Sequence, residues 1–223
     1  MPLKLLRILA KAIIVFVLFS IVLVLVLRFL PVTYTATMLM DERSVTRDWE
    51  PLSRIDRNMV SAVIAAEDSK FCEHDGFDVE AIEDALEERA RGERQRGAST
   101  ISQQTAKNVF LWQGGGWFRK GLETYFTFLI ENLWTKRRIM EVYLNVAETG
   151  QGTYGVAAGS ERYFGHSAAR LTADEASRIA AVLPSPKTRE AANPSGFTAR
   201  YGNMIEARIA VVRRDALDSC VYE

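Results

Sequence analysis

The chain has 223 residues, of which 48% are hydrophobic and 25% are charged, so its composition is that of an ordinary globular protein. Its 28 Lys and Arg residues equal its 28 Asp and Glu residues in number, which excludes the strong positive charge of a typical nucleic-acid-binding protein. Its two cysteines, Cys72 and Cys220, are too few for a disulfide framework and lack the spacing of metal ligands. We expect both to be incidental, because a bridge between them is permitted outside the cytoplasm but not implied by the sequence.

An uncharged apolar run at residues 12–27 predicts a membrane-spanning helix. Extended to residues 8–30, the helix would be about 34 Å long at about 1.5 Å per residue, which is enough to cross a bilayer. A cleaved signal peptide is the alternative, but the apolar run is longer than a typical signal-peptide core and no A-x-A cleavage site follows it. Residues 1–30 are therefore predicted to be a cytoplasmic N-terminus and a transmembrane anchor.

The charges around this helix predict its orientation. Lys4, Arg7 and Lys11 lie in or before the start of the helix, and the first acidic residue is Asp41. Because basic residues mark the cytoplasmic end of a membrane helix, we expect the N-terminus in the cytoplasm and the chain after Pro31 outside it.

The rest of the chain divides into a linker and one domain. Residues 31–57 mix β-branched and charged residues with a proline and show no helical period, so they are predicted to be a linker or stalk. Residues 58–223 show successive helical patterns and no strand segments of any length, so the predicted fold class is mainly α. The expected helices are 58–68, 78–91, 99–110, 117–134, 136–147, 153–164, 172–183 and 198–217.

The first group of candidate functional residues is an acidic pair, Glu67 and Asp68, which follows a helix of small apolar residues. Carbonyl groups at a helix C-terminus repel a carboxylate, and apolar neighbours exclude water, so both effects raise a carboxyl pKa. A raised pKa suits a general base or acid. Taken alone, the pair also fits a solvated helix end.

The second group lies on a helix expected to start at Ser99. At helical spacing, Thr100, Gln103, Gln104 and Lys107 share one broad face near the helix N-terminus. Such a face suits a phosphate or a sugar, although an ordinary solvated face has the same composition.

The third group places two cations near another carboxylate. Arg119 and Glu123 are four residues apart, and Lys120 and Glu123 are three apart, so all three meet on one helix face. They fit either surface ion pairs or a cationic site beside a second functional carboxylate.

These groups fall within five ordered motifs. The pattern EDxxFxxHxGFD is met at residues 67–78, G-[GA]-S-T-I-[ST]-Q-Q at residues 97–104 and RKxxE at residues 119–123. A fourth motif begins with RRIMEVYLN at residues 137–145 and continues to YFG, and the fifth, L-x-x-x-E-A…LPxP, is met at residues 171–186. Together they resemble the glycosyltransferase family fifty-one domain, and most closely its monofunctional biosynthetic members.

The resemblance implies a lysozyme-like, two-lobed helical domain with one N-terminal transmembrane helix, on the periplasmic side of a bacterial inner membrane. It implies polymerisation of lipid II into β-1,4-linked glycan, by inverting attack of the acceptor 4-hydroxyl on the donor anomeric carbon with release of undecaprenyl pyrophosphate. The expected partners are lipid II, the growing glycan strand and the membrane, with cell-wall synthesis and division proteins as further candidates.

The resemblance also implies roles for the candidate residues. Glu67 and Glu123 are the expected catalytic residues, with Glu67 as the general base. No cofactor is expected to be required, although Glu123 is a candidate ligand for Mg²⁺ or Mn²⁺ against the pyrophosphate. The expected substrate-binding residues are Asp68, Ser99, Thr100, Gln103, Gln104, Lys107, Arg119 and Lys120.

Three departures and two rival functions accompany the resemblance. Cys72 lies within the first motif, Ala98 replaces a frequent glycine, and Gly115 stands where many members carry a basic residue. A lytic transglycosylase or lysozyme-like hydrolase would use one Glu to protonate a glycosidic oxygen, but would not need the cations at residues 107–120. A catalytically silent scaffold would not need Glu67 and Glu123. His74 is expected to have a structural role, because neutral imidazole readily satisfies buried hydrogen bonds.

Overall fold

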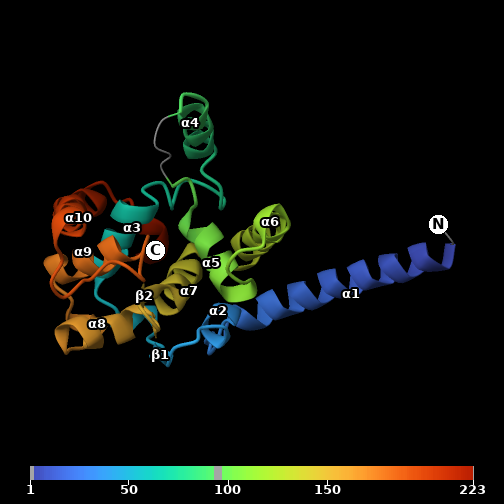
Figure 1. Ribbon diagram of the computed structural model, residues 1–223, viewed down its shortest axis with the longest axis horizontal. Coiled ribbons are helices and arrows are strands. Elements are labelled where there is room, and N and C mark those ends of the chain that lie inside the picture. The colour runs from blue at the N-terminus through green and yellow to red at the C-terminus, as the bar shows by residue number, and fades with distance from the viewer. Residues whose placement is uncertain (1–2, 93–96, 223) are drawn as a thin grey trace.

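The computed structural model describes residues 3–92 and 97–222 and is mainly helical, as predicted (Figure 1). A long apolar helix extends away from a body of shorter helices. The α-helices of the described chain are α1 Leu3–Leu27, α2 Ala36–Leu39, α3 Arg57–Glu67, α4 Val79–Ala90, α5 Ile101–Phe110, α6 Gly116–Leu133, α7 Lys136–Val146, α8 Val156–Phe164, α9 Ala173–Val182, α10 Gly196–Arg214 and α11 Ser219–Tyr222. The described residues also form two 3₁₀ helices, Leu52–Arg54 and Ala168–Arg170. They form three short strands, β1 Thr46–Arg47, β2 Glu148–Gly150 and β3 Thr153–Tyr154.

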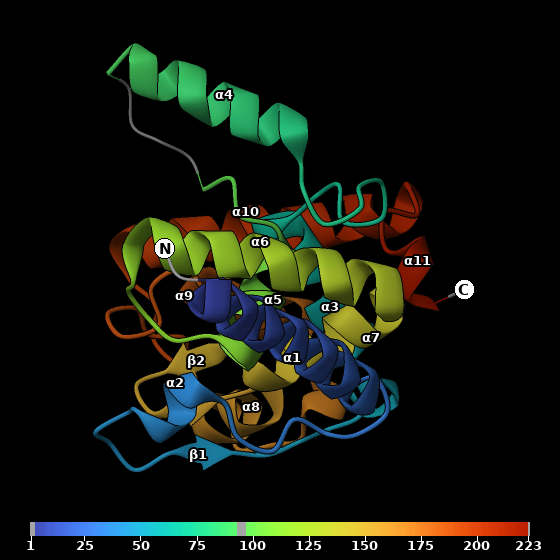
Figure 2. The same cartoon turned by 90° about the vertical axis from the view of Figure 1, so that its right-hand side faces the viewer.

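Helix α1 is long and apolar enough to cross a membrane. Most of its side chains are exposed, and only its C-terminal part meets the body, near α6 (Figure 2). An exposed apolar helix is stable in lipid but not in water, so the structure agrees with the predicted anchor.

Polar contacts fix the end of α1 to the body. The Trp134 indole N–H donates to the Val24 carbonyl at 2.8 Å, and the Arg138 guanidinium donates to the Leu27 carbonyl at 2.8 Å. Both carbonyls lie in the last turn of the helix, where a cationic side chain is favourable. The Val24 carbonyl also accepts from the Arg28 N–H at 3.0 Å. The Ser20 and Tyr125 hydroxyls also lie 2.6 Å apart. The anchor therefore has a defined attachment beside the domain.

The body consists of two groups of helices. In one group α3 packs against α9 and α10, and in the other α5 packs against α6 and α7. Helix α3 is buried along most of its length, including Met59, Val60 and the run from Ala62 to Ala65. The end of α3 lies where α5 approaches it, and the Gln104 amide of α5 donates to Glu67 at 2.7 Å (Figure 1).

The segment 31–57, predicted as a stalk, contacts the body along its length. Met38 and Leu52 are buried in the core, and β1 pairs with β3 in parallel, with Thr46 opposite Thr153. β3 also pairs with β2 in antiparallel orientation. The sequence did not predict these strands, because runs of two or three residues are too short to show the alternation of a strand. The division at residues 30 and 57 stays a prediction.

The starts of α5 and α8 differ from the expected ones for local chemical reasons. Helix α5 is capped by Thr100 rather than Ser99, and Thr100 and Gln103 form a reciprocal capping box. Helix α8 starts later than residue 153, because Thr153 is paired in β3. The capping box of Thr172 and Glu175 at the start of α9 is confirmed.

The expectation that the cysteines are incidental is wrong. Cys72 and Cys220 form a disulfide across 148 residues, with their Cα atoms 5.5 Å apart. Sequence spacing does not reveal this pairing, since it arises only when α11 folds back against α7. Buried Asp218 reinforces the attachment of the C-terminus through an ion pair with Arg57 at 2.8 Å.

We expect replacement of both cysteines by serine to lower the free energy of unfolding by about 2–4 kcal/mol, because the bridge restricts a long loop in the unfolded chain. Denaturant unfolding in detergent measures the loss. A reductant should destabilise the wild type by the same amount and leave the Cys72→Ser/Cys220→Ser variant unchanged. Equal stability of the oxidised and reduced wild type would contradict a stabilising role for the bridge.

Candidate active site

Glu67 ends α3 beside the N-terminal half of α5. Its Oε2 accepts a hydrogen bond from the Gln104 amide at 2.7 Å. Its Oε1 is buried and has no hydrogen-bond partner among the described residues. Burial raises the pKa of Glu67, and the Gln104 hydrogen bond and the Lys107 charge offset part of that rise. This combination gives a carboxylate with a free, poorly hydrated oxygen, which is suited to accept a proton.

Asp68 lies next in sequence but has a different environment. Its carboxylate accepts hydrogen bonds from the Ile101 backbone N–H at 3.0 Å and from His74 Nε2 at 3.0 Å. The other ring nitrogen, His74 Nδ1, accepts from the Gly76 N–H at 3.1 Å, so Nε2 carries the proton toward Asp68. Asp68 therefore links the loop after α3 to the start of α5, and His74 has the structural role expected for it.

The capping box engages two of the predicted substrate-binding residues of α5. Buried Thr100 donates to the Gly76 carbonyl at 2.7 Å and accepts from the Gln103 N–H at 3.1 Å. The Gln103 side chain accepts from the Thr100 N–H at 3.0 Å. Ser99 is exposed, and its carbonyl lies 3.5 Å from the Gln104 amide. Gln104 and Lys107 are the members of this helix face that reach the larger cleft described next.

Glu67 lines one cleft, and its hydrogen-bond partner Gln104 lines another. The larger has a volume of about 480 Å³ and is lined by Gln104, Lys107, Asn108, Gln113, Tyr143, Ala147, Glu148 and the segment 183–188. The smaller has a volume of about 200 Å³, and its lining includes Glu67, Asp68, Ser99, Thr100 and Arg208. The hydrogen bond from Gln104 to Glu67 joins the linings of the two clefts.

Three cations, Lys107 on α5 and Arg119 and Lys120 on α6, lie near Glu123. Arg119 and Lys120 on α6 both bind the buried carboxylate of Glu123, at 2.6 Å and 2.5 Å. Burial lowers the pKa of Lys107; Glu123 and Glu67 oppose the shift, while Arg119 and Lys120 add to it. Lys107 is therefore within electrostatic reach of both carboxylates and both other cations. With one carboxylate bound to two of them, the group retains positive charge for an anionic ligand.

The arrangement around Glu123 does not fit a metal held by the protein. Both of its carboxylate oxygens bind cationic side chains. Across residues 3–92 and 97–222, no group of three or more His, Cys, Asp or Glu side chains is placed to hold a metal ion. The predicted divalent ion would have to rely on substrate oxygens for most of its ligands.

Two tyrosines near the site were not predicted as functional residues. Buried Tyr143 has its hydroxyl 3.5 Å from the Gln104 side-chain oxygen, and Tyr201 donates to the Ala66 carbonyl at 3.0 Å. Tyr201 shares a helical stripe with core residues, and spacing alone does not show that its hydroxyl reaches the end of α3. Tyr143 lies within a recognised motif, which was the available signal.

A carboxyl with a raised pKa near a cationic group, on a helical domain attached to an apolar helix, fits the class of enzymes that act on anionic substrates at a membrane. The chain belongs to the transglycosylase family, which matches residues 34–210. It is 48% identical over 204 residues to a biosynthetic peptidoglycan transglycosylase of Caulobacter vibrioides, covering 90% of this chain and 89% of that protein. A protein of the same name from Bdellovibrio bacteriovorus is 46% identical over 222 residues, covering 96% of this chain and 89% of the relative.

Proposed function

We propose that this protein is a peptidoglycan glycosyltransferase that polymerises lipid II on the outer face of the inner membrane. The observation that carries the proposal is the Glu67 carboxyl, with one oxygen that has no partner among the described residues, near Lys107, which itself lies near Arg119 and Lys120. The relatives named biosynthetic peptidoglycan transglycosylase support the same function.

In the proposed reaction, the acceptor 4-hydroxyl attacks the anomeric carbon of the donor with inversion. Glu67 removes the hydroxyl proton as the new glycosidic bond forms. The bond between the anomeric carbon and the pyrophosphate oxygen breaks, and the electron pair leaves with undecaprenyl pyrophosphate. Lys107, Arg119 and Lys120 offset the negative charge that develops on this leaving group. Glu123 holds Arg119 and Lys120 in position through its two ion pairs.

The cationic group also separates synthesis from glycan cleavage. A lytic enzyme breaks a bond between two sugars, and its leaving group is a hydroxyl that needs a proton. It gains nothing from three cations next to the reacting carbon. The lytic alternative therefore leaves the main charged feature of the site without a role.

The direct experiment is incubation of the purified full-length protein with labelled lipid II in detergent. We expect glycan polymer and released undecaprenyl pyrophosphate. Cleavage of isolated cell walls without polymerisation of lipid II would favour the lytic function instead.

The orientation of the anchor is a further part of the proposal. Because Lys4, Arg7 and Lys11 lie at the N-terminal end of α1, we expect the domain after the helix to be periplasmic. A C-terminal fusion to a reporter active only in the periplasm should be active, and a fusion to a reporter active only in the cytoplasm should be silent. The opposite pattern would reverse the topology.

A further inference from the structure

The larger cleft contains charged residues of both signs that the proposed reaction does not use. Glu148 starts β2, immediately after α7, and Lys187 lies in the segment after α9. Both line the same cleft as Gln104 and Lys107. A carboxylate in this position is unexpected next to a site for pyrophosphate, because it repels that ligand.

The Glu148 carboxyl is only partly satisfied. Its Oε1 is buried without a hydrogen-bond partner among the residues that the structure describes. Burial raises the pKa of Glu148, while the Lys187 charge and a hydrogen bond from the Gly152 backbone offset part of the rise. A buried acceptor without a partner is costly, so a donor on a bound ligand would be favoured here.

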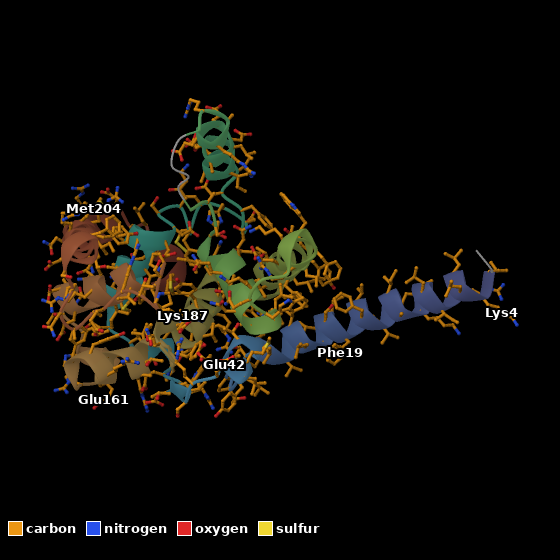
Figure 3. The ribbon with its side chains drawn as sticks, in the orientation of Figure 1. Lys4, Phe19, Glu42, Glu161, Lys187 and Met204 are labelled. Carbon is orange, nitrogen blue, oxygen red and sulfur yellow. A yellow bond between two sulfur atoms is a disulfide. The ribbon has the colours of Figure 1, made fainter. Side chains whose placement is uncertain are left out.

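Lys187 provides the complementary charge at the rim. Its backbone carbonyl accepts from the Gln151 amide at 2.7 Å, which holds the segment in place. Its side chain is exposed and makes no ion pair with the other described residues, and neighbouring Thr188 is also exposed. Figure 3 labels Lys187 on the body of the domain, apart from the membrane helix. A fixed backbone with a free ammonium group is suited to bind a carboxylate.

The parts of lipid II differ in charge, and a site with both a carboxylate and an ammonium group fits a part that carries both signs. The sugars of lipid II are uncharged at their hydroxyl and acetamido groups, and the pyrophosphate carries only negative charge. Lipid II is a disaccharide-pentapeptide, and its peptide stem is the part that can carry both carboxylates and, on a basic side chain, an amine. We propose that Glu148 and Lys187 form a subsite for this peptide stem, an inference that rests on the proposed function. Glu148 accepts from the amine, and Lys187 binds a carboxylate where the stem leaves the cleft toward solvent.

The test compares lipid II with two modified forms, one with its stem amine acetylated and one with its stem carboxylates amidated. We expect Glu148→Gln to raise KM for unmodified lipid II by about threefold to tenfold, with kcat within about twofold, because one partly exposed charge-assisted contact is lost. The same variant should show no increase in KM over wild type with the acetylated form. Lys187→Ala should show the matching pattern, with its effect absent for the amidated form.

Glu161→Gln is the matched control, because Glu161 is exposed on α8 and does not line the cleft (Figure 3). Its KM should equal that of wild type for all three substrates. Equal increases in KM for modified and unmodified lipid II would show a merely structural role for Glu148 and Lys187 and would overturn the subsite. Failure of the wild type to polymerise any form would instead overturn the proposed function itself.

Discussion

Replacement of Glu67 by Gln is expected to reduce the initial rate of lipid II polymerisation by about 10²–10⁴-fold, because the amide has nearly the same shape but cannot accept the acceptor's proton. The fold should be at least as stable as wild type at neutral pH. Burial raises the pKa of Glu67 in the folded protein, so the free energy of unfolding falls as the pH rises from the unfolded pKa through the folded one. A neutral amide does not ionise and avoids this loss of stability. Polymerisation rates and thermal unfolding measure the two effects.

Glu73→Gln is the control for this prediction. Glu73 is exposed in the loop that follows Asp68, and it is absent from the linings of both clefts. We expect it to polymerise lipid II at the wild-type rate. A folded Glu67→Gln variant that retains more than about a tenth of the wild-type rate would remove Glu67 from the role of general base.

The sequence predicted the helical fold and the environment of Glu67 because both depend on local patterns. Small apolar residues before Glu67 indicated a poorly hydrated carboxyl, and the structure confirms that burial raises its pKa. The partner of that carboxyl was less predictable. Gln104 lies 37 residues further along the chain, and only the packing of α3 near α5 shows that its amide reaches Glu67.

Helical spacing was less informative about how side chains on α5 are used. It placed Thr100 and Gln103 on the same face as Lys107, but side chains at a helix start often bond to the backbone instead. Both form the capping box here, so their predicted contacts with substrate stay predictions. The disulfide was not predicted for a different reason. The distance between Cys72 and Cys220 is a property of the folded chain alone.

Replacement of Lys107 by Ala is expected to slow polymerisation about thirtyfold to a thousandfold, which corresponds to about 2–4 kcal/mol of transition-state stabilisation. Burial lowers the pKa of Lys107, which shows that little water surrounds its ammonium group. Its charge therefore acts on the leaving pyrophosphate with little screening by water. Arg119 and Lys120 remain in the variant, but Glu123 binds both. Initial rates with lipid II measure the effect.

Arg170→Ala is the control, because it removes one positive charge from an exposed position outside both cleft linings and should leave the rate unchanged. The same variants should also be tested for cleavage of isolated cell walls. A hydrolase would lose little on removal of Lys107, because no anionic group leaves in its reaction. A wild-type rate of polymerisation in Lys107→Ala would place the pyrophosphate elsewhere, whereas a loss specific to polymerisation would connect the buried cation to the departure of the lipid pyrophosphate.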